Sequence, residues 1–191
     1  MSDEKTRTFF SKTSDAARRN LSNFAPSAAP IGVTPELCRE FKVPEMNRSF
    51  DCIEAVYQAF KIMTCTARDP RQRDDCLDRL SSGGSDAAGL AAKRLGSKTS
   101  TLKRGLKLNP SVWTHVMERS VMKMAIGARA KVDPVYRAKL CEAVAGKFTW
   151  LHIETRKPAS KCRWGGFFRD GQWHGQNELG QLMLEVARSL S

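Results

Sequence analysis

The segment DCIEAVYQAFK, residues 51–61, constrains the fold most strongly, because its apolar residues repeat at the spacing of an α-helix. At about 100° per residue, four apolar side chains gather on one side of this helix: Ile53, Val56, Phe60 and Met63. This side is expected to pack into a core. Glu54, Gln58 and Lys61 align along another side, with Tyr57 at the border between the two. The pattern leaves two alternatives open for the polar side: a solvated face or the wall of a site.

Periodicity in the rest of the chain predicts a mostly helical α+β protein. Further helices are expected over five ranges: 69–80, 87–96, 109–131, 134–145 and 179–190. Residues 147–155 alternate and contain β-branched side chains, which predicts a strand. Residues 9–50, rich in Pro, Ser and Ala, are typical of irregular loops with short strands, and residues 98–108 indicate a basic connector. At 191 residues, we predict one compact domain over 9–191 after a flexible N-terminus, residues 1–8.

Residues with capping chemistry mark the ends of two of these helices. Asp51 or Ser49 can cap the helix that contains Lys61, and Asp86 can cap the helix over 87–96. Gly96 is a natural C-terminal stop for that helix. The buried side of the longest helix is expected to consist of four positions: Val112, Val116, Val121 or Met122, and Ala125.

The net charge of +12 is high for a chain of this size, and it is unevenly distributed. Residues 87–117 contain no Asp or Glu, but they carry six cations: Lys93, Arg94, Lys98, Lys103, Arg104 and Lys107. A positive field of this kind attracts polyanions such as nucleic acid, or a phosphate-rich small molecule. The alternative is a surface charge that serves only solubility.

Apolar runs, cysteines and histidines argue against several classes of protein. No apolar run approaches the roughly 18 residues of a membrane span, and the N-terminus lacks the apolar core of a secretory signal. We therefore expect an intracellular protein, cytoplasmic or nuclear, with no membrane partner. The 6 cysteines are scattered without a C-x-x-C motif, and the 3 histidines are isolated. Buried or idle thiols, no metal site and no cofactor are the expectation.

Two other stretches have residues suited to a nucleotide. Asn23 and Phe24 lie in a Pro-bounded loop, where such a pair can hydrogen-bond and stack on a base or ribose, or simply hold a turn and fill the core. Residues 164–180 contain several glycines, which let backbone approach a ligand closely. A tight hairpin followed by a capped helix would explain those glycines equally well. Trp113, on the longest helix, is either a core residue or a stacking platform.

Lys61 is a candidate covalent catalyst, because a lysine amine forms a Schiff base with the open-ring carbonyl of a sugar. The amine must first lose its proton, through desolvation or neighbouring cations. Glu54 lies two turns earlier on the same side of the helix, where it can exchange protons or orient a hydroxyl group.

Taken in order, five stretches resemble motifs of the NADAR (YbiA-like) family. Residues 21–31, LSNFAPSAAPI, are similar to its LSNF-P-PI segment, and residues 53–61, IEAVYQAFK, to its E-H-x-Y-Q-x-x-K helix. Residues 91–96, AAKRLG, resemble its A-K-x-x-G turn. Trp113 with VMKMAI resembles its W…VM-x-x-A-L helix, and residues 164–186 resemble its glycine-rich ending. The resemblance covers nearly the whole chain.

This resemblance implies a compact α+β fold that cleaves N-glycosidic bonds. Family members act on ADP-ribose attached to guanine, or on phosphoribosyl-type intermediates of riboflavin synthesis. Carried over to this chain, Lys61 is the Schiff-base residue and Glu54 assists proton transfer. The implied ligand-binding positions are Asn23, Phe24, Tyr57, Gln58, Trp113, Trp164, Gly165 and Asn177.

The chain departs from the family pattern at three places. The family's His after the Glu is Ala55, its acidic residue before the W-G pair corresponds to Lys161, and residues 68–84 make one connection longer. A mechanism that needs two carboxylates is weakened by these changes, whereas a lysine-centred mechanism is not. Three acids are candidate replacements, and the sequence does not choose among them: Asp51, Glu154 and Asp170.

Three hypotheses follow. The first is an N-glycosidase that removes ADP-ribose from guanine in DNA, RNA or a free nucleoside, with ADP-ribose as the product. The second is hydrolysis of early riboflavin intermediates. The third is a module that binds ADP-ribose or nucleic acid without catalysis.

Overall fold

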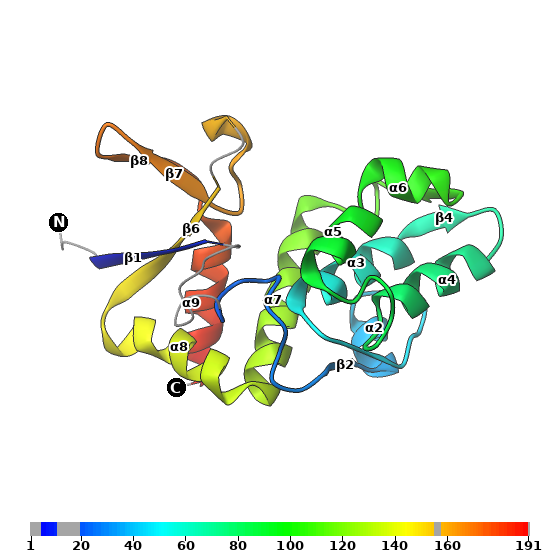
Figure 1. Ribbon diagram of the computed structural model, residues 1–191, viewed down its shortest axis with the longest axis horizontal. Helices are drawn as coiled ribbons and strands as arrows, with labels where there is room; N and C mark the ends of the chain where they lie inside the picture. Colours follow the sequence, from blue (N-terminus) through cyan, green and yellow to red (C-terminus); the bar gives the residue numbers. More distant parts are fainter. Residues whose placement is uncertain (1–4, 11–19, 155–157, 191) are drawn as a thin grey trace. The chain divides into compact units, whose positions relative to one another are not determined.

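The computed structural model describes residues 5–10, 20–154 and 158–190, and the chain divides into two compact units (Figure 1). Unit 1 consists of Met1–Ser22 with Pro134–Ser191, and unit 2 consists of Asn23–Asp133. Both units contain helices and strands, which confirms the predicted α+β class. Within the described ranges, no helix combines the length and the apolar character that crossing a membrane requires.

Unit 2 is built around α3 (Ile53–Met63), the helix predicted from the strongest periodicity. Helices α4 (Arg71–Leu80), α5 (Gly89–Leu95) and α7 (His115–Val132) all pack against it. Its apolar side is buried as predicted, and in total 10 of its 11 residues are buried. The polar side of α3 is therefore covered by protein, and the alternative of a solvated face is wrong.

Two short pairs of antiparallel strands and two short helices complete the described part of unit 2. Strand β2 (Ile31–Val33) pairs with β3 (Arg48–Phe50), and β4 (Cys65–Ala67) pairs with β5 (Leu106–Leu108), both antiparallel. Residues 98–108, expected to be a basic connector, instead contain α6 (Lys98–Lys103) and strand β5. The signal for α6 is Ser97, whose side chain accepts a hydrogen bond from the backbone N–H of Ser100.

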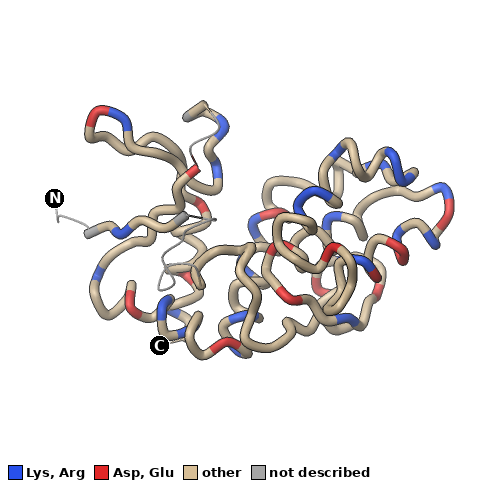
Figure 2. The backbone as a smooth tube through the Cα atoms, viewed as in Figure 1, with Lys and Arg blue, Asp and Glu red and all other residues tan. Residues whose placement is uncertain are grey.

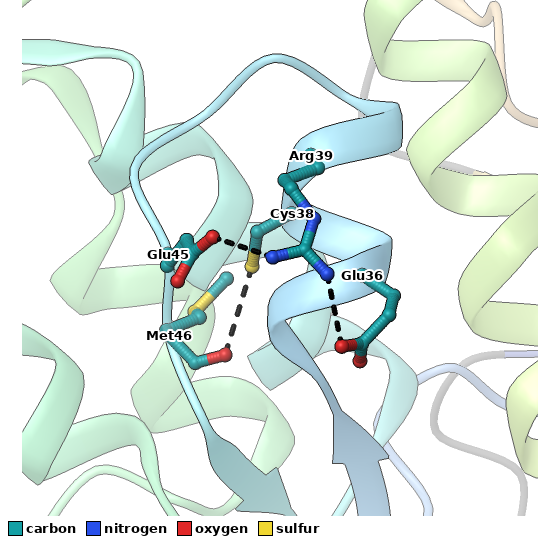
Figure 3. Close-up of polar contacts among 5 residues, drawn as sticks. All are labelled: Glu36, Cys38, Arg39, Glu45 and Met46. Atoms are coloured by element: carbon teal, nitrogen blue, oxygen red, sulfur yellow. Dashed lines mark hydrogen bonds and ion pairs between the residues drawn. The ribbon is translucent and has the colours of Figure 1, made fainter.

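Helix α2 (Pro35–Glu40) lies in the range expected to hold loops and short strands. Its Arg39 bridges two carboxylates (Figure 3), with Nη2 at 3.0 Å from Glu36 Oε1 and Nη1 at 2.8 Å from Glu45 Oε1. The buried Cys38 thiol donates to the backbone oxygen of Met46 at 3.7 Å. These contacts hold the loop after α2 against the helix.

Several predicted helix ends differ from the observed ones. The N-cap residues of α3 and α5 are Cys52 and Ala88, and neither makes a side-chain cap, so the predicted caps by Asp51, Ser49 and Asp86 are wrong. Asp86 instead accepts a hydrogen bond from Arg79 Nε at 2.6 Å. Gly96 does end α5, as predicted.

The long helix α7 begins later than predicted, at His115 rather than near residue 109. Thr114 caps it by accepting from the backbone N–H of Met117. Val112 therefore precedes the helix, and both it and Val116 are exposed. At the other two positions expected on the buried side, the candidate residues are buried: Val121 and Met122 at one, and Ala125 at the other.

Unit 1 is a four-stranded sheet with two helices. The strand order is β1-β6-β7-β8, with β1 (Lys5–Phe10) parallel to β6 (Phe148–Ile153). Helices α8 (Pro134–Ala145) and α9 (Glu178–Leu190) pack on each other and on β6. The strand β6 and both helices lie where the sequence predicts them.

The start of the chain differs from the flexible segment expected over residues 1–8. Residues 1–4 lie outside the described part, whereas residues 5–8 belong to β1, where Thr6 and Thr8 pair with Thr149 and Leu151. Strands β7 (Gly166–Arg169) and β8 (Gln172–Gly175) form a tight hairpin. The two residues at its tip, Asp170 and Gly171, have φ values of 51° and 75°, as two-residue hairpin turns require.

The six cysteines are free, and all except Cys141 are buried. Burial raises the pKa of Cys52 and of Cys65 to about 11, so these thiols stay protonated at neutral pH. The prediction of buried or idle thiols is confirmed.

An ion pair in the interior of unit 2 joins α7 to the loop before β2. Arg129, with no exposed side-chain surface, places Nη2 at 3.1 Å from Asp133 Oδ2 and donates to the backbone oxygen of Pro26 at 3.2 Å. Asp133 also accepts from the backbone N–H of Ala28 at 3.3 Å. A buried pair of this kind matters mainly because either partner alone would be an uncompensated charge.

We predict that Asp133→Asn lowers the free energy of unfolding by about 3–5 kcal/mol, because the Arg129 charge would remain buried without a counter-charge. Urea titration followed by circular dichroism measures the loss. The matched control is Glu36→Gln, which removes one carboxylate from the exposed pair with Arg39 and should have a much smaller effect. Equal losses in the two variants would contradict the importance of the buried pair.

Candidate functional site

The polar edge of α3 is a row of three side chains, of which Glu54 and Gln58 are buried and Lys61 is half-buried. Glu54 is 6% exposed and Gln58 is 5% exposed, and Lys61 is half-buried at the end of the row. Gln58 Nε2 donates a hydrogen bond to Glu54 Oε1 at 2.8 Å. The spacing of four residues places the amide directly over the carboxyl group along the helix. The three candidate residues therefore lie in one row, inside the protein.

Gly96, at the end of α5, contacts two members of this row. Lys61 Nζ donates to the backbone oxygen of Gly96 at 3.0 Å. A Cβ atom on residue 96 would lie only 1.8 Å from Gln58 Oε1, so a larger residue would displace the amide group. Glycine is thus needed here for close packing as well as for ending the helix. The sequence indicated only the second of these roles.

The loop that carries Asn23 and Phe24 lies against the first turn of α3. The backbone N–H of Glu54 donates to the backbone oxygen of Asn23 at 3.0 Å. A Cβ atom on Gly89 would lie 2.3 Å from Phe24 Cα, so the start of α5 is pressed against the same loop. Lys93 Nζ lies 5.1 Å from the centre of the Phe24 ring, within the range of a cation–π contact.

Lys93 lies beside the polar edge of α3, although the sequence prediction did not select it. It was counted only among the basic residues of 87–117, although it stands in the AAKRLG stretch that resembles a family motif. Its charge acts on Glu54 and its Nζ faces Phe24, so it belongs to the surroundings of the polar edge.

Tyr57 and Trp113 form the aromatic border of the polar edge. Their ring centres are 5.2 Å apart at an interplanar angle of 70°, an edge-to-face arrangement. Both residues are largely buried, at 8% and 6% exposure. This burial favours a packing role for the Trp113 ring. The Nε1 atom is the part of that side chain that can donate a hydrogen bond.

Three predicted binding residues of unit 2 carry buried polar atoms with no hydrogen-bond partner among the described residues: Asn23 Oδ1, Gln58 Oε1 and Trp113 Nε1. Asn23 does use its amide nitrogen, which donates to Met122 Sδ at 3.5 Å. Buried polar atoms are nearly always paired, so three unpaired atoms around one helix need an explanation. A polar ligand would supply the donors that the two amide oxygens lack and the acceptor that Trp113 Nε1 lacks.

Burial raises the pKa of Glu54 above its ordinary value of 4.5, because the charged carboxylate loses its hydration. The hydrogen bond from Gln58 and the positive charges of Lys93 and Lys61 act in the opposite direction, but burial is the largest effect. Glu54 therefore keeps its proton to a higher pH than an exposed glutamate does. A carboxyl group in that condition is suited to act as a general acid.

The other three predicted binding residues, Trp164, Gly165 and Asn177, belong to unit 1. Asn177 ties α9 to β6, since its Oδ1 accepts from the backbone N–H of His152 at 3.0 Å and its Nδ2 donates to the backbone oxygen of Trp150 at 2.8 Å. A Cβ atom on Gly165 would lie 2.2 Å from the backbone oxygen of His152. The two hydrogen bonds explain why residue 177 is Asn, and the close approach to His152 explains why residue 165 is Gly. Neither explanation requires a ligand.

Trp164 is half-buried and stacks with Arg163, whose guanidinium carbon lies 4.5 Å from the ring centre. The backbone oxygen of Trp164 accepts from the N–H of Leu179 at 3.1 Å. Of the three residues, Trp164 is the one that is not fully buried. Its role in binding stays a prediction.

The positions that depart from the family pattern have simple structural settings. Ala55 is fully buried in α3, and Lys161 is exposed at the end of the short 3-10 helix η1 (Ala159–Lys161). Of the candidate replacement acids, Asp170 is exposed at the hairpin tip, and Asp51 and Glu154 are half-buried. Over the described ranges, no group of three or more His, Cys, Asp or Glu residues could hold a metal ion.

We predict that Glu54→Gln raises the free energy of unfolding at neutral pH. A glutamate whose pKa is raised by folding binds more protons in the folded state than in the unfolded state. Its contribution to the free energy of unfolding is therefore fully present below the unfolded pKa, near 4.5, and is lost as the pH rises through the folded pKa. The variant should lack this decline and should keep an oxygen that accepts from Gln58. Urea titrations between pH 4 and pH 8 measure both curves; parallel curves would contradict the raised pKa.

Neither protein-family models nor curated proteins give a match to this chain. The resemblance to the NADAR family accordingly rests on the five sequence motifs, and four of them place residues on or beside α3 in unit 2: the loop with Asn23 and Phe24, α3 itself, the end of α5, and Trp113 with α7.

Proposed function

We propose that this protein is an N-glycosidase that releases ADP-ribose from a modified guanine base through a Schiff base on Lys61. The observation that carries the proposal is the burial of the polar edge of α3, where a carboxyl group, an amide and a lysine lie in one row next to Gly96. A solvated face would have no need for the glycine at residue 96 or for the hydrogen bond that joins Gln58 to Glu54.

In the first step, the bond between C1 of the ribose and the base nitrogen breaks. Glu54, which burial keeps protonated to a raised pH, gives its proton to the departing base. The neutral amine of Lys61 forms a bond to C1, and the carboxylate of Glu54 takes up the proton that the attacking nitrogen loses. At the end of this step the free base carries the proton from Glu54 on its nitrogen, and C1 of the sugar is bonded to the Lys61 nitrogen.

In the second step, the ribose ring opens, so that C1 and the Lys61 nitrogen form an imine and the ring oxygen becomes a hydroxyl group. Water then adds to C1, the lysine nitrogen leaves as the amine, and ADP-ribose closes its ring again. The net change is addition of one water molecule across the glycosidic bond. The contact between Lys61 Nζ and the oxygen of Gly96 supports this role, because it holds the nitrogen at a defined position before attack.

The remaining residues have proposed roles in binding. Asn23 Oδ1 and Gln58 Oε1 are acceptors for ribose hydroxyl groups, and Trp113 Nε1 is a donor to a phosphate or sugar oxygen. Phe24 offers a ring for stacking, and Lys93 above it offers a positive charge to the pyrophosphate. Tyr57, Trp164, Gly165 and Asn177 stay in the proposal as positions implied by the resemblance.

We predict that borohydride, added while the protein acts on ADP-ribosylated guanosine, traps an ADP-ribose adduct on Lys61. Borohydride reduces the imine to a stable amine, and peptide mass spectrometry locates the modified lysine. Lys61→Ala should give no adduct and no free guanosine. The matched control, Lys131→Ala, removes an exposed lysine of the same unit and should behave like the wild type.

The same assay separates the other hypotheses. Turnover by Lys61→Ala at the wild-type rate would rule out the lysine mechanism. Binding of ADP-ribose without turnover by any variant would favour a module without catalysis. Turnover of a phosphoribosyl-type riboflavin intermediate, but not of ADP-ribosylated guanosine, would favour the second hypothesis.

We predict that Glu54→Gln lowers kcat by roughly 10²–10⁴, the range that a general acid contributes. The amide keeps the size of the side chain and an acceptor for Gln58, so substrate binding should change little. Steady-state kinetics on ADP-ribosylated guanosine measures kcat and KM separately. A change in KM alone would mean that Glu54 only helps to bind substrate.

A further inference from the structure

Two neighbouring cavities of unit 2 are lined by cations, and neither is lined by residues of α3. The first, of about 720 Å³, lies among α6, the turn before β5 and the paired strands β4 and β5, and the second, of about 340 Å³, lies between α5 and α6. Lys103 and Arg104 line both cavities. The cations of the two cavities together form what we call the basic strip: Arg68, Arg79, Arg94, Lys103, Arg104 and Lys107.

The charge of the basic strip is largely uncompensated. Among the described residues that line either cavity, Asp86 is the only acid, and it is held by Arg79, with Nη2 at 2.5 Å from Oδ2. No salt bridge to another described residue involves any of the other five cations. Arg104 has a buried Nε atom that finds no acceptor within the described part of the chain. Figure 2 shows how Lys and Arg recur along α5, α6 and the segments that flank β4 and β5.

Neutral hydrogen-bonding groups accompany these cations. Gln72 lines the first cavity, and its amide group packs against Gly105, where a Cβ atom would lie 2.5 Å from Nε2. Thr99 and Ser100 line the second cavity. Lysine, arginine, hydroxyl and amide groups are the side chains that contact phosphate oxygens in complexes with nucleic acid.

We propose that the basic strip binds the backbone phosphates of a nucleic-acid strand. Cations line both cavities, and the two cavities share Lys103 and Arg104, an arrangement that suits successive phosphates better than a single one. The chain's net charge of +12 would draw such a strand from a distance. This inference deepens the proposed function, because it makes the substrate a polymer rather than a free nucleoside. It rests on the proposed function for the identity of the modified base in that polymer.

The test measures the affinity of the whole chain for a fluorescein-labelled, unmodified single-stranded oligonucleotide by fluorescence anisotropy, from 50 to 200 mM KCl. The variant Lys103→Gln/Lys107→Gln removes two exposed cations of the strip. The matched control, Lys42→Gln/Lys131→Gln, removes two exposed lysines of the same unit that line neither cavity. Thermal melts confirm that both variants are folded.

The strip variant is expected to bind every sequence more weakly than the wild type. The magnitude of its slope of log K against log[salt] should be smaller by about 1.4, because each phosphate of a single strand that the variant no longer neutralises contributes about 0.7. The control should keep the wild-type slope. Equal losses of affinity in both variants, or no loss in either, would overturn the proposal. Competition by inorganic pyrophosphate as effective as that of the oligonucleotide, at equal phosphate concentration, would also overturn it in favour of a small ligand.

The oligonucleotide carries no ADP-ribose, so this result does not depend on turnover. Hydrolysis of free ADP-ribosylated guanosine, which has no backbone, is measured separately on the wild-type chain. Absence of strand binding together with hydrolysis of the nucleoside would overturn the strip alone. Strand binding without hydrolysis would support the strip and leave the proposed chemistry without support.

Discussion

The hydrogen bond from Gln58 to Glu54 governs how unit 2 is arranged around its central helix. Helix α3 has almost no exposed side, so its carboxyl group must find a partner inside the protein. Gln58 supplies that partner, one turn along the helix. Its amide can lie there only because residue 96 has no Cβ atom, and the backbone oxygen of the same glycine then accepts from Lys61. The end of α5 and the polar edge of α3 are thus mutually dependent.

A buried carboxyl group next to cations is subject to two opposing effects. Loss of hydration raises the pKa of Glu54, and the charges of Lys93 and Lys61 lower it, with burial the larger effect. For a general acid this balance is useful, because the group must hold its proton near neutral pH and still release it to a leaving base. Once the carboxylate forms, the charge of Lys93 stabilises it, while Lys61 acts as the neutral nucleophile. The surroundings of Glu54 therefore suit both of its charge states.

The parts of the fold that the sequence predicted well are those in which one face of an element is strongly apolar. Helix α3 and strand β6 follow that rule. The sequence missed α6 and β5 because the many lysines of residues 98–108 hide a short helix whose main signal is the cap by Ser97. It missed β1 because this strand is defined by pairing with β6, about 140 residues away, which no local pattern reveals.

The candidate site was predictable to a similar degree. The spacing of Glu54, Gln58 and Lys61 predicted that they share one side of a helix, but not that α5 covers that side. The burial comes from Gly89 and Gly96, whose missing side chains allow α5 to approach the Phe24 loop and the Gln58 amide. Lys93 was overlooked as a site residue because its importance depends on that approach.

Helix α5 is where the proposed chemistry and the proposed strand binding meet. Consecutive residues on a helix point about 100° apart, and here Lys93 lies over the Phe24 ring while Arg94 lines the second cavity of the basic strip. One helix thus directs positive charge both toward Glu54 and toward the strip. An acidic residue on α5 would pair with Lys93 or Arg94. Such a pair would weaken the positive charge that acts on Glu54 or the positive charge of the basic strip. These two proposed requirements would explain why α5 contains no Asp or Glu.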